Sequence, residues 1–90
     1  MKIEVTQGRN KNQNGKVFDL GKAKNVRVSP FDYIEHDFEN TIKVGGKEYY
    51  IQVSTYKSGR TPTARLALCK DGKRSIQGGT HFDKIQILED

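Results

Sequence analysis

The sequence predicts a mainly β protein, a small antiparallel barrel or curled sheet of six to eight short strands with one short helix near 30–38. Apolar and polar residues alternate in most segments, which is the period of a β-strand. Turn dipeptides that contain glycine separate these segments at short intervals. The 90 residues suffice for a single domain, 1–90, so consecutive hairpins must curl to cover one hydrophobic face.

The first third of the chain predicts short strands on either side of a long polar segment. Lys2–Thr6 alternates between polar and apolar residues. The segment 7–16 contributes no core residue, so we expect a flexible loop or arm there, with a tight turn at Asn14-Gly15. Two further short strands are predicted at Lys16–Leu20 and Asn25–Val28.

The segment 30–38 is compatible with two kinds of secondary structure, a short helix or a strand. Ser29-Pro30 is typical of a helix start, and Asp32 stands where a capping box places an acid. Three apolar residues have the spacing i, i+3, i+7, which places them on one face of a helix: Phe31, Ile34 and Phe38. We therefore predict a short helix, while a strand is the competing interpretation because aromatic and β-branched side chains also suit a sheet.

The clearest hairpin is centred on Gly45-Gly46, a pair that tolerates positive φ at both turn positions. Its strands are Thr41–Val44 and Lys47–Tyr56. A two-residue turn fixes the register, which then pairs Val44 with Lys47, Lys43 with Glu48 and Ile42 with Tyr49.

A second hairpin joins Lys47–Tyr56 to Thr63–Lys70 across the loop Lys57–Pro62. We expect Tyr56 opposite Thr63, and the inner face then pairs Thr55 with Ala64, Val53 with Leu66 and Ile51 with Leu68. The outer face carries Tyr50, Gln52, Ser54 and Tyr56 opposite Thr63, Arg65, Ala67 and Cys69.

The end of the chain predicts two more strands. Asp71-Gly72 forms a tight turn into a strand at Lys73–Ile76. A loop at Gln77–Thr80 follows, and Phe82–Leu88 closes the sheet with Ile85 and Ile87 facing inward.

The charge of the chain is bipolar. The formal net charge is +5, from 16 Lys and Arg against 11 Asp and Glu. Residues 1–30 hold seven basic and two acidic side chains, and residues 49–81 hold six basic and one acidic. The segments between and after them, 31–48 and 82–90, are net acidic. If the two basic segments lie together, they form a stronger positive patch than the net charge indicates.

The outer face of the second hairpin is the candidate binding site. Flat rings interleaved with cations suit an unpaired nucleic acid, because rings stack on bases and cations neutralise phosphates. The candidate residues are Tyr50, Tyr56, Lys57, Arg60, Arg65, Lys70, Lys73 and Arg74, with Arg9 and Lys11 from the polar segment. This pattern predicts a small non-enzymatic nucleic-acid-binding module, with single-stranded DNA or RNA favoured. The structural alternative is that Tyr–Arg pairs and edge lysines only stabilise an exposed sheet.

Other chemistry finds little support in the sequence. A histidine-based nuclease would need two such groups converging on one phosphate, and the sequence gives no sign that His36 and His81 do so. Cys69 has no paired base that would make it a reactive thiol. The acidic stretch 32–39 lacks the spacing and glycine of a calcium loop, so it is interpreted as a solvated face or a contact for a basic partner. We expect no catalysis, no cofactor and no metal.

The alternative function is a protein-binding module, such as an inhibitor or assembly factor, that docks through a sheet edge or charged face. A homodimer formed by sheet edges is compatible with either function. No apolar run approaches the roughly 20 residues of a membrane span, and no secretory signal is recognised at Met1-Lys2. One cysteine forms no internal disulfide, so a cytoplasmic location is expected. In size and β content the chain is similar to small proteins encoded by phages or mobile elements, including phage single-strand DNA-binding proteins, although no motif carries this similarity.

Overall fold

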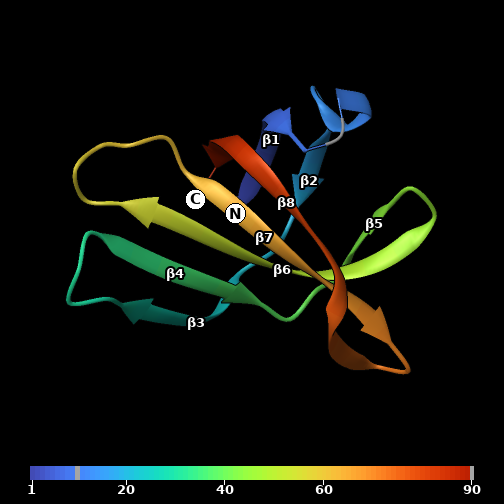
Figure 1. The fold of residues 1–90 in the computed structure, drawn as a ribbon. Coiled ribbons are helices and arrows are strands. Elements are labelled where there is room, and N and C mark those ends of the chain that lie inside the picture. Colours follow the sequence, from blue (N-terminus) through green and yellow to red (C-terminus); the bar gives the residue numbers. More distant parts are fainter. Residues whose placement is uncertain (10, 90) are drawn as a thin grey trace.

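The computed structural model describes residues 1–9 and 11–89, except for the side chains of 76–80. Eight strands fill most of this part of the chain, and they form one curled antiparallel sheet in the order β2-β1-β8-β7-β6-β4-β3, with β5 paired to β6 (Figure 1). A 3-10 turn, η1, is the one helical element among these residues. The elements are β1 Lys2–Gly8, η1 Lys11–Gln13, β2 Val17–Asp19, β3 Ala23–Val28, β4 Tyr33–Phe38, β5 Ile42–Val44, β6 Lys47–Tyr56, β7 Thr63–Lys70 and β8 Lys73–Glu89. The predicted fold class is confirmed.

The core lies on the inner side of the curled sheet, as the alternation predicts. Its buried hydrophobic side chains are Ile3, Val5, Leu20, Phe38, Ile42, Val44, Tyr49, Ile51, Val53, Ala64, Leu66, Phe82 and Ile85. The ring of Phe82 stacks on Phe18 with centroids 5.8 Å apart. No helix in the described part of the chain has the length and apolar character that a membrane crossing requires.

The glycine turn between β5 and β6 forms as predicted. Gly45 and Gly46 have φ of 58° and 80°, the region that two-residue hairpin turns require. The observed pairs, Ile42 with Tyr49, Lys43 with Glu48 and Val44 with Lys47, confirm the predicted register. The turn at Asp71-Gly72 is also confirmed, because Lys70 pairs with Lys73 across it.

The segment near 30–38 is a strand and not a helix, so the predicted helix is wrong and the competing interpretation is correct. Tyr33–Phe38 forms β4, which pairs with β3 along one edge and β6 along the other. These ladders satisfy its backbone polar groups on both sides. Ser29 closes a hairpin turn instead of capping a helix: its hydroxyl accepts a hydrogen bond from the Phe31 N–H at 3.0 Å, and its N–H donates to the Tyr33 carbonyl.

The β6–β7 hairpin differs from the prediction by two residues in register. Thr63 pairs with Ser54 instead of Tyr56, and Val53 pairs with Ala64. The ladder ends there because Pro62 has no N–H to donate, and its carbonyl accepts a hydrogen bond from Ile85 of β8. A shift of two residues preserves the faces, so the predicted inner and outer sides are correct although the predicted partners are wrong.

The loop predicted at Gln77–Thr80 is part of β8, so that loop and the separate strands on each side of it are wrong. β7 advances two positions from Leu66 to Leu68, while β8 advances five positions between their partners, Ser75 and Thr80. The backbone thus keeps a strand conformation through an irregular pairing that accommodates extra residues, as a β-bulge does.

Part of the polar segment 7–16 is fixed against β1. The N–H of Gly8 donates to the Asn14 side chain at 2.8 Å, and the N–H of Gly15 donates to the Val5 carbonyl at 2.7 Å. Gln13, in η1, is buried in spite of its polarity. Residue 10 lies outside the described residues.

Candidate functional site

The candidate site is the outer face of β6 and β7, on the side of the sheet opposite the core. Side chains alternate along each strand, and the buried Ile51 and Val53 leave the residues between them facing outward. The outward residues are Tyr50, Gln52, Ser54 and Tyr56 on β6 and Thr63, Arg65, Ala67 and Cys69 on β7. Arg65 is exposed and lies opposite Gln52, between the two tyrosines.

At one end of this face, an arginine side chain packs on the ring of Tyr56. The guanidinium of Arg60 lies over the Tyr56 ring, 4.4 Å from its centroid, and the Tyr56 hydroxyl lies 3.1 Å from the Thr63 hydroxyl oxygen. The loop that bears Arg60 is held from the β3–β4 turn, because the Asp32 carboxylate accepts hydrogen bonds from the Ser58 backbone N–H and hydroxyl. This tether keeps the arginine close to its ring.

At the other end of the face, a second arginine side chain packs on the ring of Tyr50. Arg74, from the start of β8, lies over the Tyr50 ring at 5.5 Å, and the Tyr50 hydroxyl donates to the Gly72 carbonyl at 2.9 Å. Two effects chiefly raise the pKa of the Tyr50 hydroxyl: the larger is a hydrogen bond with Cys69, and the smaller is desolvation of the hydroxyl. The hydrogen bond to Gly72 fixes the orientation of the ring against the β7–β8 turn.

Two acidic residues of β4 beside this face are already paired. Arg27 of β3 forms ion pairs with Glu35 at 2.7 Å and with Asp37 at 3.4 Å, both on β4. The second oxygen of Asp37 accepts a hydrogen bond from Gln52 at 2.9 Å. The hydrogen bond to Glu35 and the charge of Asp37 raise the pKa of Arg27 further above its ordinary value. These contacts reduce the repulsion that the β4 carboxylates would exert on a bound anion.

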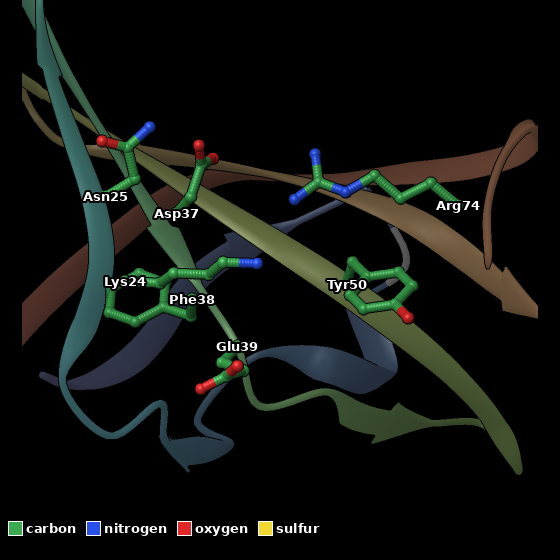
Figure 2. A pocket seen from close by; sticks show the side chains of 7 residues that line it. All are labelled: Lys24, Asn25, Asp37, Phe38, Glu39, Tyr50 and Arg74. Atoms are coloured by element: carbon green, nitrogen blue, oxygen red, sulfur yellow. The ribbon is translucent and has the colours of Figure 1, made fainter. Parts of the chain in front are cut away.

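A cavity of about 470 Å³ lies beside Tyr50 (Figure 2). Figure 2 shows the Tyr50 ring and the Arg74 guanidinium on one side and a group of polar side chains across from them. Its lining consists of Lys24, Asn25, Asp37, Phe38, Glu39, Tyr50 and Arg74. The cavity therefore joins the β8 end of the candidate face to β3 and β4, and it offers space for a flat ligand against Tyr50.

The other candidate residues divide between the two ends of the face. Lys57 is exposed next to Arg60, at the Tyr56 end. Lys70 and Lys73 are exposed and pair with each other beside the β7–β8 turn, next to the outward pair of Cys69 and Arg74. Alternation therefore turns these two lysines toward the side of the sheet opposite the candidate face. The cations on the face itself are thus Arg60 at one end, Arg74 at the other and Arg65 between them.

The two basic residues of the polar segment lie farther away. The backbone N–H of Arg9 donates to the His81 carbonyl at 3.3 Å, and His81 pairs with Arg65, so β8 lies between Arg9 and the candidate face. Lys11 lies in η1, which packs on β1, and β8 separates it from the candidate face. The structure places six of the ten candidate residues on β6, β7 and the loop between them, and two more, Lys73 and Arg74, at the start of β8.

The histidines and the cysteine are separated. His36 faces the inner side, where its Nε2 lies 3.2 Å from the Thr55 hydroxyl oxygen, whereas His81 lies on β8. Cys69 is a free, half-buried thiol on the outer face. Within the described residues, no three His, Cys, Asp or Glu side chains lie close enough together to hold a metal ion.

Comparisons of the chain with protein-family profiles, with curated proteins and with solved structures found no match.

Proposed function

We propose that this chain is a non-enzymatic module that binds single-stranded DNA or RNA along the outer face of β6 and β7. The observation that carries the proposal is the pair of tyrosine–arginine contacts at the two ends of β6, with the exposed Arg65 between them. The tyrosines are six positions apart on one strand, which corresponds to about 20 Å. That length accommodates several nucleotides of an extended chain.

Each end of the face combines the two kinds of contact that an unpaired nucleic acid uses. A tyrosine ring offers a stacking surface worth about 1–3 kcal/mol per base. The adjacent guanidinium is weakly hydrated and presents paired N–H donors that match the oxygens of a phosphate. An arginine already resting on a ring therefore needs little reordering to contact the phosphate next to a stacked base.

A single-stranded ligand is favoured over a duplex. The helical content of the described residues is one three-residue 3-10 turn, which is too short to enter a major groove. A sheet face with separated rings instead suits bases that are already unstacked.

Salt dependence tests this proposal. If three to five phosphates contact the flanking cations, the logarithm of the association constant should fall with the logarithm of salt concentration with a slope of about −2 to −4. Fluorescence anisotropy with labelled oligonucleotides, from low to moderate salt, measures this slope. An absence of binding even at low salt contradicts the proposal, as does equal or stronger binding of the matching duplex.

A second candidate function is binding to another protein through the β3 edge. β3 ends the sheet, and on its inner side Val26 is 50% exposed and Val28 is 64% exposed. An edge strand with unpaired backbone groups and exposed apolar side chains suits an added strand from a partner or from a second copy. Capture experiments with and without nuclease treatment discriminate the two functions, and light scattering reports a homodimer.

A further inference from the structure

The cavity beside Tyr50 lies at a break in the pairing of β6. β4 pairs with β6 as far as Gln52, and β5 pairs with it as far as Tyr49, so neither strand pairs with Tyr50. The chain passes from β4 to β5 through Glu39 at this point. The hollow beside the break has a volume of about 470 Å³, within the range of about 300–1,000 Å³ that is typical of ligand-binding cavities.

An irregularity in β3 brings a lysine to this cavity. β3 advances two positions from Ala23 to Asn25, while β4 advances one position between their partners. Lys24 is the extra residue of this β-bulge, and bulges change the direction of side chains. Lys24 and Asn25 therefore line the same cavity, although they are neighbours in one strand. Figure 2 shows the Lys24 ammonium group extending toward the Tyr50 ring.

Two carboxylates line the cavity, and they differ in their contacts. Both oxygens of Asp37 are engaged, one with Gln52 and the other with Arg27. Glu39 is exposed, and the ion pairs within the described residues are those of Arg27 with β4. The Glu39 carboxylate and the Lys24 ammonium group are therefore available to a ligand, one as an acceptor and the other as a donor.

We propose that this cavity selects guanine among the bases of a bound strand, an inference that rests on the proposed nucleic-acid function. Unpaired bases expose their Watson–Crick edges to a protein. On that edge guanine places two donors, the N1 and N2 N–H groups, side by side, with the acceptor O6 next to them. The donors suit the two oxygens of the Glu39 carboxylate, and O6 suits the Lys24 ammonium group. Tyr50 supplies the ring on which the base stacks.

The other bases fit this pair of charges less well. Thymine and uracil carry one donor, N3–H, between two carbonyl oxygens that repel a carboxylate. Adenine and cytosine carry one amino group beside a ring nitrogen that is an acceptor, so they offer the carboxylate no second hydrogen bond. A carboxylate that receives both donors of guanine therefore discriminates against the other bases.

Anisotropy titrations at one salt concentration test the inference, with thymine oligonucleotides of about eight nucleotides that differ in their central base. The central base is thymine, adenine, cytosine, guanine or hypoxanthine, which is guanine without the N2 amino group. We expect the guanine strand to bind about tenfold more tightly than the thymine strand. The hypoxanthine strand should lose most of this preference, because only the N1–H donor remains. The adenine strand should bind within about twofold of the thymine strand, which separates guanine selection from the stacking of any purine.

Glu39→Gln tests the carboxylate with little change in the size of the side chain. Glu39 is exposed, so the variant should fold, and its preference for guanine over thymine should fall to about twofold or less. Glu89→Gln is the matched control, because it removes the same charge at an exposed position outside the cavity lining. It should keep the full preference. Lys24→Met, also at an exposed position, should lower the preference by removing the donor to O6.

Equal affinity for the guanine and thymine strands overturns this inference and leaves the proposed function in place. The same holds if the adenine or hypoxanthine strand binds as tightly as the guanine strand. An unchanged preference in Glu39→Gln, or an equal loss of preference in Glu89→Gln, also overturns it. Failure of every strand to bind, even at low salt, contradicts the proposed function and this inference together.

Discussion

Replacing both Tyr50 and Tyr56 with alanine should weaken binding of a single-stranded oligonucleotide by about 100-fold. Each ring is expected to contribute about 1–3 kcal/mol by stacking on a base. The double substitution also removes the surfaces on which Arg60 and Arg74 rest, so the two guanidinium groups lose their fixed positions. Anisotropy titrations at one fixed salt concentration measure the change in affinity.

Two controls separate ring stacking from loss of structure. The double variant Tyr50→Phe and Tyr56→Phe keeps both rings and removes the hydroxyl contacts with Gly72 and Thr63, so it should retain affinity within a few-fold. His36→Ala changes a residue on the inner side and should have less effect than the double alanine variant. Full affinity of a folded double alanine variant would show that the tyrosines do not bind nucleic acid.

Phe82→Ala should remove most of the stability of the fold. Phe82 is 1% exposed, stacks on Phe18 and joins β8 to the core. Truncating a buried phenylalanine costs about 3–5 kcal/mol, because the loss of transfer free energy is increased by the cavity that remains. Small domains have about 5–15 kcal/mol of total stability, so this variant should unfold at a much lower urea concentration.

Phe31→Ala is the matched control for this prediction, because Phe31 is 74% exposed in the β3–β4 turn. The free energy of unfolding should change by about 0.5 kcal/mol or less in that variant. Urea titrations followed by circular dichroism compare the midpoints of the two variants. An equal loss in both variants, or a loss below about 1 kcal/mol for Phe82→Ala, contradicts the position of the core.

The parts of the fold that sequence predicts are those in which local geometry leaves one solution. The Gly45-Gly46 turn fixes its register because a two-residue turn permits a single pairing of the adjoining strands. The β6–β7 loop is longer, so the faces of the strands follow from alternation but the partners do not. In segment 30–38 the apolar spacing fits both periods, and only the ladders to β3 and β6, which lie outside the segment, favour a strand.

The candidate site was predictable to a similar extent. The face on which a strand residue lies depends only on the strand period, which the sequence shows. Alternation therefore places Tyr50, Tyr56 and Arg65 on one face. The contact between Arg74 and Tyr50 depends on how the β7–β8 turn folds back, which no local pattern encodes. The ion pairs of Arg27 with β4 likewise require the β3–β4 hairpin, which the predicted helix excluded.

The burial of Gln13 had no signal in the sequence. The residues around it are all polar, and polar composition predicts exposure. Its burial follows from the packing of η1 against β1. The burial of this residue therefore becomes visible only in three dimensions.

The most direct test of the central claim maps the bound oligonucleotide on the protein. Backbone amide signals are recorded by nuclear magnetic resonance as a single-stranded oligonucleotide of about eight nucleotides is added at low salt. The proposed function predicts that the largest shifts follow the outer face from Tyr56 through Arg65 to Tyr50 and the β7–β8 turn. Shifts confined to the β3 edge, around Val26 and Val28, or no shifts at all would contradict it.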